Sequence, residues 1–266
     1  MNNEFRKKRV TLITGAGRGI GKAIALGLAR EGCDIAVISR TADEIADTAH
    51  EARAFGSESV AIRADVSVLS DVQSVAGEME SRFGRLDVLV NNAALRMNHL
   101  GNQDSYTIPF DNVTVEDWDR VIRVNLRGPF LCIKELLPLM QKAGSASIIN
   151  VSAGGGKRGM AGRTPYCASK FGLEGLTQCL AIEFRAFNIA VNSISPGAHS
   201  ILTDREKVAQ LKRNPATVYM RAEMMVPPAL FLARQNFEGI TGQHIDAFEW
   251  ITQNGYGGQE TWRAKT

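Results

Sequence analysis

The chain has 266 residues, of which 44% are apolar and 22% charged, and its formal net charge is +3. This composition supports a sizeable buried core and excludes a disordered or fibrous chain. Basic residues are dense only at 6–9, directly before an apolar stretch, so the sequence lacks the long basic face that nucleic-acid binding needs.

A membrane-spanning segment, a signal peptide and a metal site are also not expected. No run of about 18 apolar residues occurs, and the apolar segment 10–13 is too short for the core of a signal peptide. The four cysteines are scattered without metal-ligand spacing, as is usual for reduced thiols inside a cell. The sequence therefore predicts a cytoplasmic protein with no metal, no nucleic-acid partner and no membrane partner.

The first predicted elements form half of a nucleotide-binding unit. A strand over 10–14 is followed by a glycine-rich turn and by a helix whose apolar periodicity ends at Gly32. Glycines let the backbone approach a pyrophosphate, and a helix N-terminus offers unpaired N–H groups and a positive dipole end. The spacing is T-G-x-x-x-G-x-G, and a tight turn without a ligand is the alternative. The residues expected at the phosphates are Gly15, Arg18, Gly19, Ile20 and Gly21.

The second predicted strand, 34–39, ends where a dinucleotide-binding domain contacts the adenosine ribose. The residues there are Ser39, Arg40 and Thr41, with no carboxylate before Asp43. A hydroxyl and the guanidinium groups of Arg18 and Arg40 suit a 2′-phosphate, which Arg can bind through two hydrogen bonds. We therefore expect NADP(H) rather than NAD(H), the alternative being that Arg40 is a solvated loop residue.

Strands and helices then alternate, which predicts parallel pairing with right-handed crossovers. Ligands bind at the carboxyl ends of such strands, so the residues after each strand are candidates for a site. A polar stretch over 96–112 reads as a long loop, and long loops in compact domains are usually functional or mobile. The segment 198–225 is charged and weakly periodic. The remaining predicted helices are 41–55, 70–83, a long helix after Thr114, 165–187 and 226–233, and the remaining strands are 59–63, 86–91, 147–151, 190–195 and 242–246.

Tyr166 and Lys170 lie four residues apart at the start of the predicted helix 165–187, so both can point to one face. A phenol has an ordinary pKa of about 10, and a neighbouring cation favours its ionised form. Such a pair can exchange protons at neutral pH. Asn125 falls among apolar neighbours on the helix after Thr114, so we expect it to be buried with hydrogen-bond partners.

Taken together, these motifs resemble the short-chain dehydrogenase/reductase family from Val10 to about Asp246. The matching residues, in family order, are Thr14-Gly15-x-x-x-Gly19-Ile20-Gly21, Asp65, Asn91-Asn92-Ala93, Asn125, Tyr166-x-x-x-Lys170 and Pro196-Gly197. The resemblance implies one Rossmann-like α/β domain over 1–266: a doubly wound parallel sheet of about seven strands, order 3-2-1-4-5-6-7, flanked by helices. It also implies a homo-oligomer, tetramer or dimer, acting on a small carbonyl or alcohol substrate.

The resemblance further implies a role for each site residue. Tyr166 exchanges a proton with the substrate oxygen while hydride passes to or from the nicotinamide. Lys170 lowers the pKa of the tyrosine and holds the nicotinamide ribose, and Asn125 anchors a water that feeds protons to Lys170. The predicted cofactor contacts are those of the glycine turn together with Ser39, Arg40, Asp65, Val66, Asn92, Ala93, Tyr166, Lys170, Pro196 and Gly197.

One family position departs from the pattern. The serine that usually precedes the tyrosine by thirteen residues is Ala153 here, and Ser152, one residue earlier, is expected to face the other way. Three readings follow: Ser152 swings in as a catalytic residue, Thr164 or a loop residue replaces the missing donor, or catalysis is weak. The alternative function is a non-catalytic NADP(H)-binding sensor or scaffold.

The remaining departures concern the substrate. Ala94 and Thr203 differ from the family pattern, and the chain diverges from about residue 247 into a tail that reaches Trp262. We expect Trp250 and this tail to help form the pocket. The polar loop inclines the prediction towards a sugar or polyol derivative, with a 3-ketoacyl thioester also open.

Overall fold

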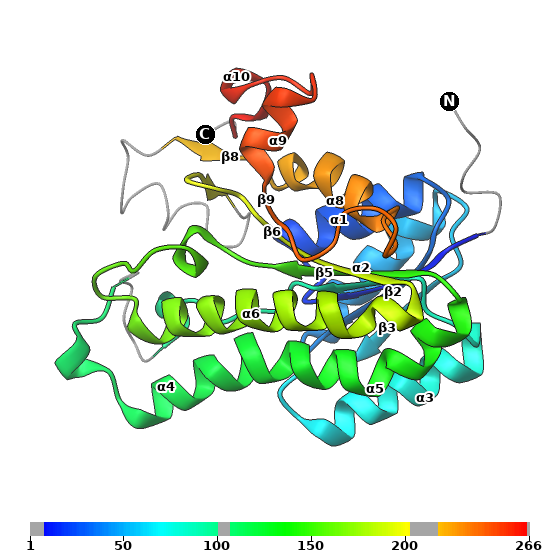
Figure 1. Ribbon diagram of the computed structural model, residues 1–266, viewed down its shortest axis with the longest axis horizontal. Helices are drawn as coiled ribbons and strands as arrows, with labels where there is room; N and C mark the ends of the chain where they lie inside the picture. The colour runs from blue at the N-terminus through cyan, green and yellow to red at the C-terminus, as the bar shows by residue number, and fades with distance from the viewer. Residues whose placement is uncertain (1–7, 101–106, 203–217, 265–266) are drawn as a thin grey trace.

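Seven parallel strands form the main sheet of the computed structural model, which describes residues 8–100, 107–202 and 218–264. Their order is β3-β2-β1-β4-β5-β6-β9 (Figure 1). This confirms the predicted order, with β9 as the seventh strand. The strands are β1 (Val10–Thr14), β2 (Asp34–Ser39), β3 (Ser59–Arg63), β4 (Val88–Asn91), β5 (Ala146–Val151), β6 (Ile189–Ser195) and β9 (His244–Asp246).

Helices cover both faces of the sheet (Figure 1). Successive residues of a strand face opposite sides of the sheet. A sheet with helices on both faces therefore needs strands that are apolar at every position. On β1, Leu12 packs into one core cluster and Ile13 into the other. One layer contains α1 (Gly19–Arg30), α2 (Ala42–Arg53) and α8 (Val226–Ala233), and the other contains α3 (Leu69–Phe83), α5 (Gly128–Ala143) and α6 (Thr164–Glu183).

The turn after β1 is held against the turn after β4. Gly15 has a positive φ of 63°, which glycine adopts without strain. The Asn92 side chain donates to the carbonyl oxygens of Thr14 and Gly15, at 2.9 and 3.0 Å, and the Asn92 backbone N–H donates to the Thr14 hydroxyl at 2.9 Å. The two turns therefore form one rigid edge at the carboxyl ends of the strands.

The predicted long helix after Thr114 is divided in the structure. Thr114 caps α4 (Val115–Ile122) by accepting a hydrogen bond from the Asp117 N–H at 3.0 Å. A π-helical turn, Arg123–Arg127, then separates α4 from α5. The predicted loop 96–112 contains the 3₁₀ helices Met97–His99 and Phe110–Asn112, and its residues 101–106 lie outside the described residues.

The segment after β6 forms a small ribbon that periodicity did not predict. It pairs β7 (Ser200–Ile201) with β8 (Tyr219–Met220) in parallel, and a 3₁₀ helix, Ala222–Met225, follows. Thr203 lies outside the described residues.

The C-terminal tail is helical and folds back on the ribbon. It contains α9 (Ala247–Gln253) and α10 (Gln259–Trp262), beyond which the Ala264 N–H donates to the Tyr219 carbonyl at 2.8 Å. Within the described part of the chain, no helix has the length and apolar character needed to cross a bilayer.

Candidate active site

Two adjoining cavities open at the carboxyl ends of the strands. The first, here called the glycine-loop cavity, lies over the turn from Gly15 to Ile20. The second, here called the tyrosine cavity, has a volume of about 320 Å³ and is lined by Tyr166 and Lys170. Both are lined by Ile20, Asn92, Ala94 and Arg96, so a long ligand can extend from one into the other.

The glycine-loop cavity gathers most of the predicted cofactor residues. Gly21 is an exception, because it packs inside the first turn of α1: a Cβ there would lie 2.4 Å from Asn92 Nδ2 and 2.5 Å from the Gly15 carbonyl oxygen. Gly21 therefore permits the close packing of the turn. The predicted residues that line this cavity are Gly15, Arg18, Gly19, Ile20, Ser39, Arg40, Asp65, Val66, Asn92 and Ala93.

The donors of this cavity fit a phosphorylated dinucleotide. Helix α1 begins at Gly19 without a side-chain cap, so its first turn presents N–H groups and a positive dipole end. Arg18 and Arg40 also line the cavity, and each has a carboxylate oxygen at 3.9 Å, from Glu44 and Asp65 respectively. Sequence reasoning missed Glu44, which lines the cavity from α2 and offsets part of the Arg18 charge.

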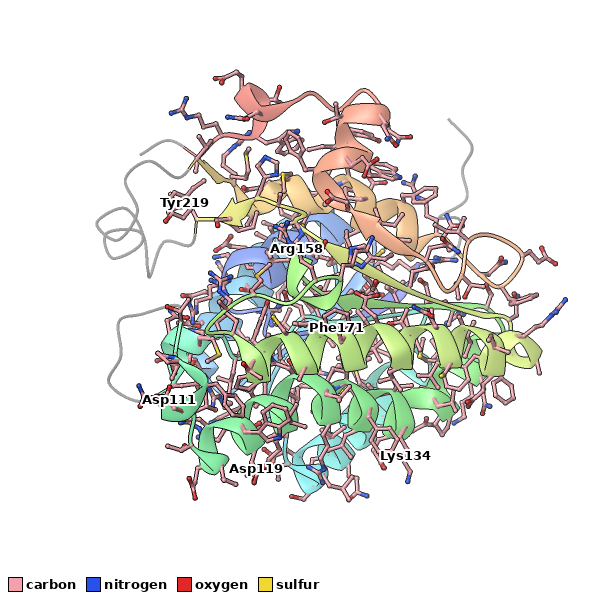
Figure 2. All side chains as sticks on the ribbon, turned by 60° about the vertical axis from the view of Figure 1, so that its left-hand side comes forward. Asp111, Asp119, Lys134, Arg158, Phe171 and Tyr219 are labelled. Atoms are coloured by element: carbon pink, nitrogen blue, oxygen red, sulfur yellow. The ribbon has the colours of Figure 1, made fainter. Side chains whose placement is uncertain are left out.

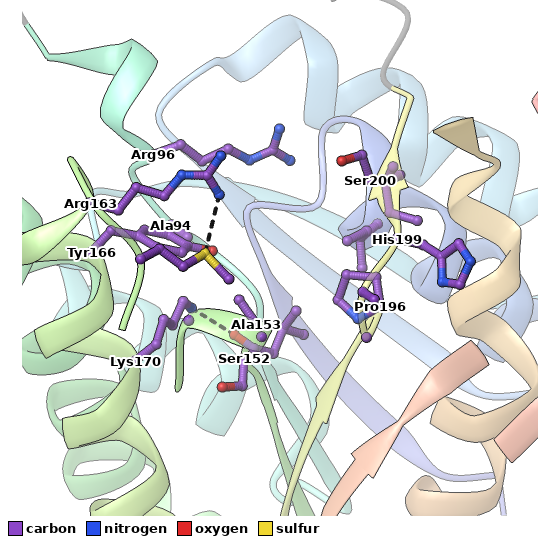
Figure 3. Close-up of a pocket in the computed structure, with 18 of the residues that line it drawn as sticks. Ala94, Arg96, Ser152, Ala153, Arg163, Tyr166, Lys170, Pro196, His199 and Ser200 are labelled. Carbon is purple, nitrogen blue, oxygen red and sulfur yellow. Dashed lines mark hydrogen bonds between the residues drawn. The ribbon is translucent and has the colours of Figure 1, made fainter. Parts of the chain in front are cut away.

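Helix α6 brings Tyr166 and Lys170 to the tyrosine cavity (Figure 3). The Lys170 ammonium lies 5.9 Å from the centre of the Tyr166 ring and donates to the Val151 carbonyl oxygen at 2.7 Å. Lys170 is thus fixed between the end of β5 and the tyrosine.

The two side chains have shifted pKa values. Burial lowers the pKa of Lys170 to about 8; Glu174 acts against this shift and Arg96 adds to it. Burial raises the pKa of Tyr166, and the positive charges of Arg96 and Arg163 oppose the rise. The sequence led us to expect a lowered tyrosine pKa caused by Lys170. The structure differs because burial dominates and because the opposing cations are arginines.

Ser152 and Ala153 follow β5 with opposite orientations. Ala153 lines the tyrosine cavity, whereas the Ser152 hydroxyl points away from Tyr166 (Figure 3). Ser152 Oγ would lie 2.9 Å from a Cβ at Gly156, and it is buried without a hydrogen-bond partner among the described residues. Of the predicted replacement donors, Thr164 does not line the cavity.

Asn125 lies in the π-helical turn and is fully buried, as predicted. Its side-chain oxygen accepts from the Leu95 N–H at 2.7 Å, and its amide nitrogen donates to the Leu95 carbonyl at 2.9 Å and to the Ser169 hydroxyl at 3.2 Å. These bonds attach the segment after β4 to α6, one residue from Lys170.

A polar network that sequence reasoning missed lies beneath Lys170. The Glu174 carboxylate contacts His244 Nδ1 at 2.8 Å and accepts from the Ser193 hydroxyl at 2.7 Å, while Ser195 Oγ lies 3.0 Å from His244 Nε2. Burial alone would raise the pKa of Glu174, but its contacts with His244 and Ser193 lower it. The four residues come from α6, β6 and β9, and no sequence motif joins them.

The C-terminal tail contacts the wall of the tyrosine cavity through Phe248 and not through Trp250. The wall on this side is formed by Pro196, Gly197, His199 and Tyr219. The Phe248 ring lies 4.0 Å from the His199 ring, centre to centre. Trp250 instead packs against Phe231 and Tyr256, at 5.3 and 5.6 Å between ring centres, and is not a lining residue, so its predicted place in the pocket is wrong.

Comparison with known proteins identifies the family. The family model described as short chain dehydrogenase matches residues 9–213. A 3-oxoacyl-(acyl-carrier-protein) reductase FabG of Staphylococcus aureus is 37% identical over 91% of this chain and 97% of its own length.

Solved structures of short-chain oxidoreductases have a similar fold. A metagenomic short-chain oxidoreductase in complex with NADP has a TM-score of 0.74 and 29% identity, over 89% of this chain and 95% of its own. Actinorhodin polyketide ketoreductase with NADPH has a TM-score of 0.79 and 27% identity, over 90% of this chain and 95% of its own. The chain belongs to the short-chain dehydrogenase family.

Proposed function

We propose that this protein is an NADP(H)-dependent oxidoreductase that interconverts a small carbonyl compound and its alcohol, with Tyr166 as the general acid/base. The observation that carries the proposal is the continuity of the two cavities. Tyr166 and Lys170 face a space that shares Ile20 and Asn92 with the glycine-loop cavity. A substrate at the tyrosine therefore adjoins a dinucleotide held over the glycine turn.

The residues of the glycine-loop cavity would hold the dinucleotide, its diphosphate at the start of α1 and its 2′-phosphate between Arg18, Ser39 and Arg40. When bound, the nicotinamide supplies or accepts the hydride. The preference for NADP(H) rests on these two arginines and on the NADP and NADPH bound to the two structural relatives described above.

The protein's own groups would move the proton. In the reductive direction, the Tyr166 hydroxyl gives its proton to the carbonyl oxygen as negative charge develops there. Lys170, with a pKa near 8, is mostly an ammonium at neutral pH and stabilises the phenolate that forms. The role proposed for Asn125 is to anchor a water that returns protons to Lys170, and its bonds to Leu95 and Ser169 fix it near that side chain.

The second candidate is a non-catalytic NADP(H)-binding sensor or scaffold. Ala153 favours it, because removing one donor from a site of developing charge costs a factor of about 10²–10³. The Ser152 hydroxyl, directed away from Tyr166, does not replace that donor in this conformation. The presence of Tyr166, Lys170 and Asn125 together argues for the enzyme.

The test is absorbance at the reduced-nicotinamide band with NADPH, then NADH, against ketones, ketoacyl thioesters and sugars. Turnover that is faster with NADPH supports the proposal. NADPH that binds without any turnover across the panel would favour the sensor or scaffold instead.

A further inference from the structure

The described residues that line the tyrosine cavity include four permanent or near-permanent cations and no carboxylate. The cations are Arg96, Arg158, Arg163 and Lys170. The proposed reaction uses Lys170 but gives no role to the arginines. Arg163 is half-buried and Arg158 is exposed, so both guanidinium groups can meet a ligand that enters the cavity.

Arg163 lines the cavity from the residue before α6. It is half-buried, and its Nη1 lies 3.5 Å from the Sδ of Met160, another lining residue. Its side chain makes no capping bond to the helix. Figure 3 shows its guanidinium group above Tyr166.

Arg158 approaches the same cavity from the turn after the 3₁₀ helix Gly154–Gly156. Arg158 and Tyr219, both labelled in Figure 2, line this cavity, and the Arg158 side chain is exposed. No carboxylate among the described residues forms an ion pair with Arg158 or Arg163. Their charges are therefore available to a ligand.

The arginines act at the reacting position as well as at the cavity wall. The positive charges of Arg96 and Arg163 oppose the rise in the pKa of Tyr166 that its burial causes, and both arginines line the cavity beside it. Arg163 also stands at the positive end of α6, a helix of 20 residues, so its charge and the helix dipole have the same sign. An anion bound here would lie within a small molecule's length of the tyrosine.

We infer that the substrate carries an oxyanion, a carboxylate or a phosphate, on the same small molecule as its carbonyl group, and that Arg158 and Arg163 bind this oxyanion. The inference rests on the proposed function for the carbonyl part of the substrate. Guanidinium groups match both oxyanions with paired hydrogen bonds. The tyrosine cavity has about 320 Å³ to share between the substrate and the nicotinamide end of the cofactor, which favours a compact keto acid or keto phosphate. The anion fixes the molecule so that its carbonyl faces Tyr166.

The test is calorimetric titration of the protein, saturated with NADP⁺, with non-reacting probes. The anionic probes are cyclohexanecarboxylate and benzyl phosphate, and their neutral counterparts are cyclohexanecarboxamide and benzyl methyl ether, neither of which is an alcohol or a ketone. The variants are R158Q and R163Q, with K157Q as the matched control, because Lys157 is exposed on the same turn but does not line the cavity. We expect at least one anion to bind, its neutral counterpart to bind at least tenfold more weakly, and R163Q to weaken the anion at least tenfold while K157Q does not.

Equal binding of the acid and its neutral counterpart would overturn the inference. So would a loss in K157Q as large as that in R163Q, or a loss caused by Arg40→Gln but not by R163Q, which would place the anion in the glycine-loop cavity. Preference for the carboxylate or for the phosphate tells which oxyanion the site selects.

Turnover provides an independent arm with 4-oxocyclohexanecarboxylate and its methyl ester. R163Q should raise KM for the acid at least tenfold and change KM for the ester less than threefold. An equal fall of kcat for both would instead make Arg163 a donor to the reacting oxygen and overturn the inference. Anion binding without turnover would contradict the proposed function alone, and turnover of neutral ketones without anion binding would contradict this inference alone.

Discussion

His244 Nδ1 lies 2.8 Å from Glu174 Oε1, one turn of α6 beyond Lys170. His244 and Ser193 contact the Glu174 carboxylate, and its negative charge favours the ammonium form of Lys170. Lys170 is buried and would otherwise lose its proton more readily. Glu174 and its hydrogen-bond partners thus help to set the pH range over which Lys170 is an ammonium beside Tyr166, the proposed proton donor.

Glu174→Gln should shift the pH dependence of the reaction. Removing the carboxylate removes the charge that raises the pKa of Lys170, so this pKa falls below its present value near 8. As pH rises, Lys170 then loses its proton at a lower pH than in the wild type. The alkaline limb of kcat/KM for carbonyl reduction should therefore move to lower pH. The exposed Glu183→Gln on the same helix is the control. A limb that stays in place or moves to higher pH in Glu174→Gln would contradict this account.

Ala153→Ser should raise turnover. The side chain at 153 lines the tyrosine cavity beside Tyr166, and a hydroxyl there adds a donor to the oxygen on which charge develops. The gain in kcat can reach the factor of about 10²–10³ that such donors contribute elsewhere, with the KM for NADPH unchanged. Steady-state kinetics measures it. An unchanged or lower kcat would mean that another group, such as an arginine of the cavity, already serves the oxygen.

Arg40→Ser should reduce the preference for NADPH. The Arg40 side chain is 65% exposed and 3.9 Å from Asp65, so its removal leaves the fold intact while removing a guanidinium group from the 2′-phosphate position. We expect KM for NADPH to rise about tenfold or more, consistent with loss of a charged hydrogen bond, and KM for NADH to change little.

Lys22→Ser serves as the control for net charge, since Lys22 pairs with Glu51 and does not line the glycine-loop cavity. If Arg40→Ser and Lys22→Ser weakened NADPH and NADH alike, the 2′-phosphate assignment would fail.

Much of the fold could be predicted because local patterns determine it. The apolar strands, the glycine turn and the helix Val226–Ala233 follow from periodicity and from glycine chemistry. The opposite orientations of Ser152 and Ala153 follow from the alternation of an extended chain. The division at Arg123–Arg127 could not be predicted, because a π-helical turn keeps the same apolar pattern as an α-helix.

The functional features that were missed depend on distant residues. Glu174 and His244 are 70 positions apart and meet only because α6 packs against β6, the strand with which β9 pairs. Arg96 and Arg163 come from turns after β4 and before α6, and each reads in the sequence as a solvated loop residue. The ribbon β7–β8 pairs two-residue strands, which are too short to show an alternating pattern.

The most direct test of the proposed catalytic role compares NADPH oxidation by the wild type and by Tyr166→Phe with the best substrate of the panel. The variant removes one hydroxyl and keeps the ring that packs beside Lys170. The account predicts that the variant binds NADPH as tightly as the wild type but loses kcat by at least the factor of about 10²–10⁴ expected for a general acid. A variant that binds NADPH and reduces the substrate at the wild-type rate would contradict it.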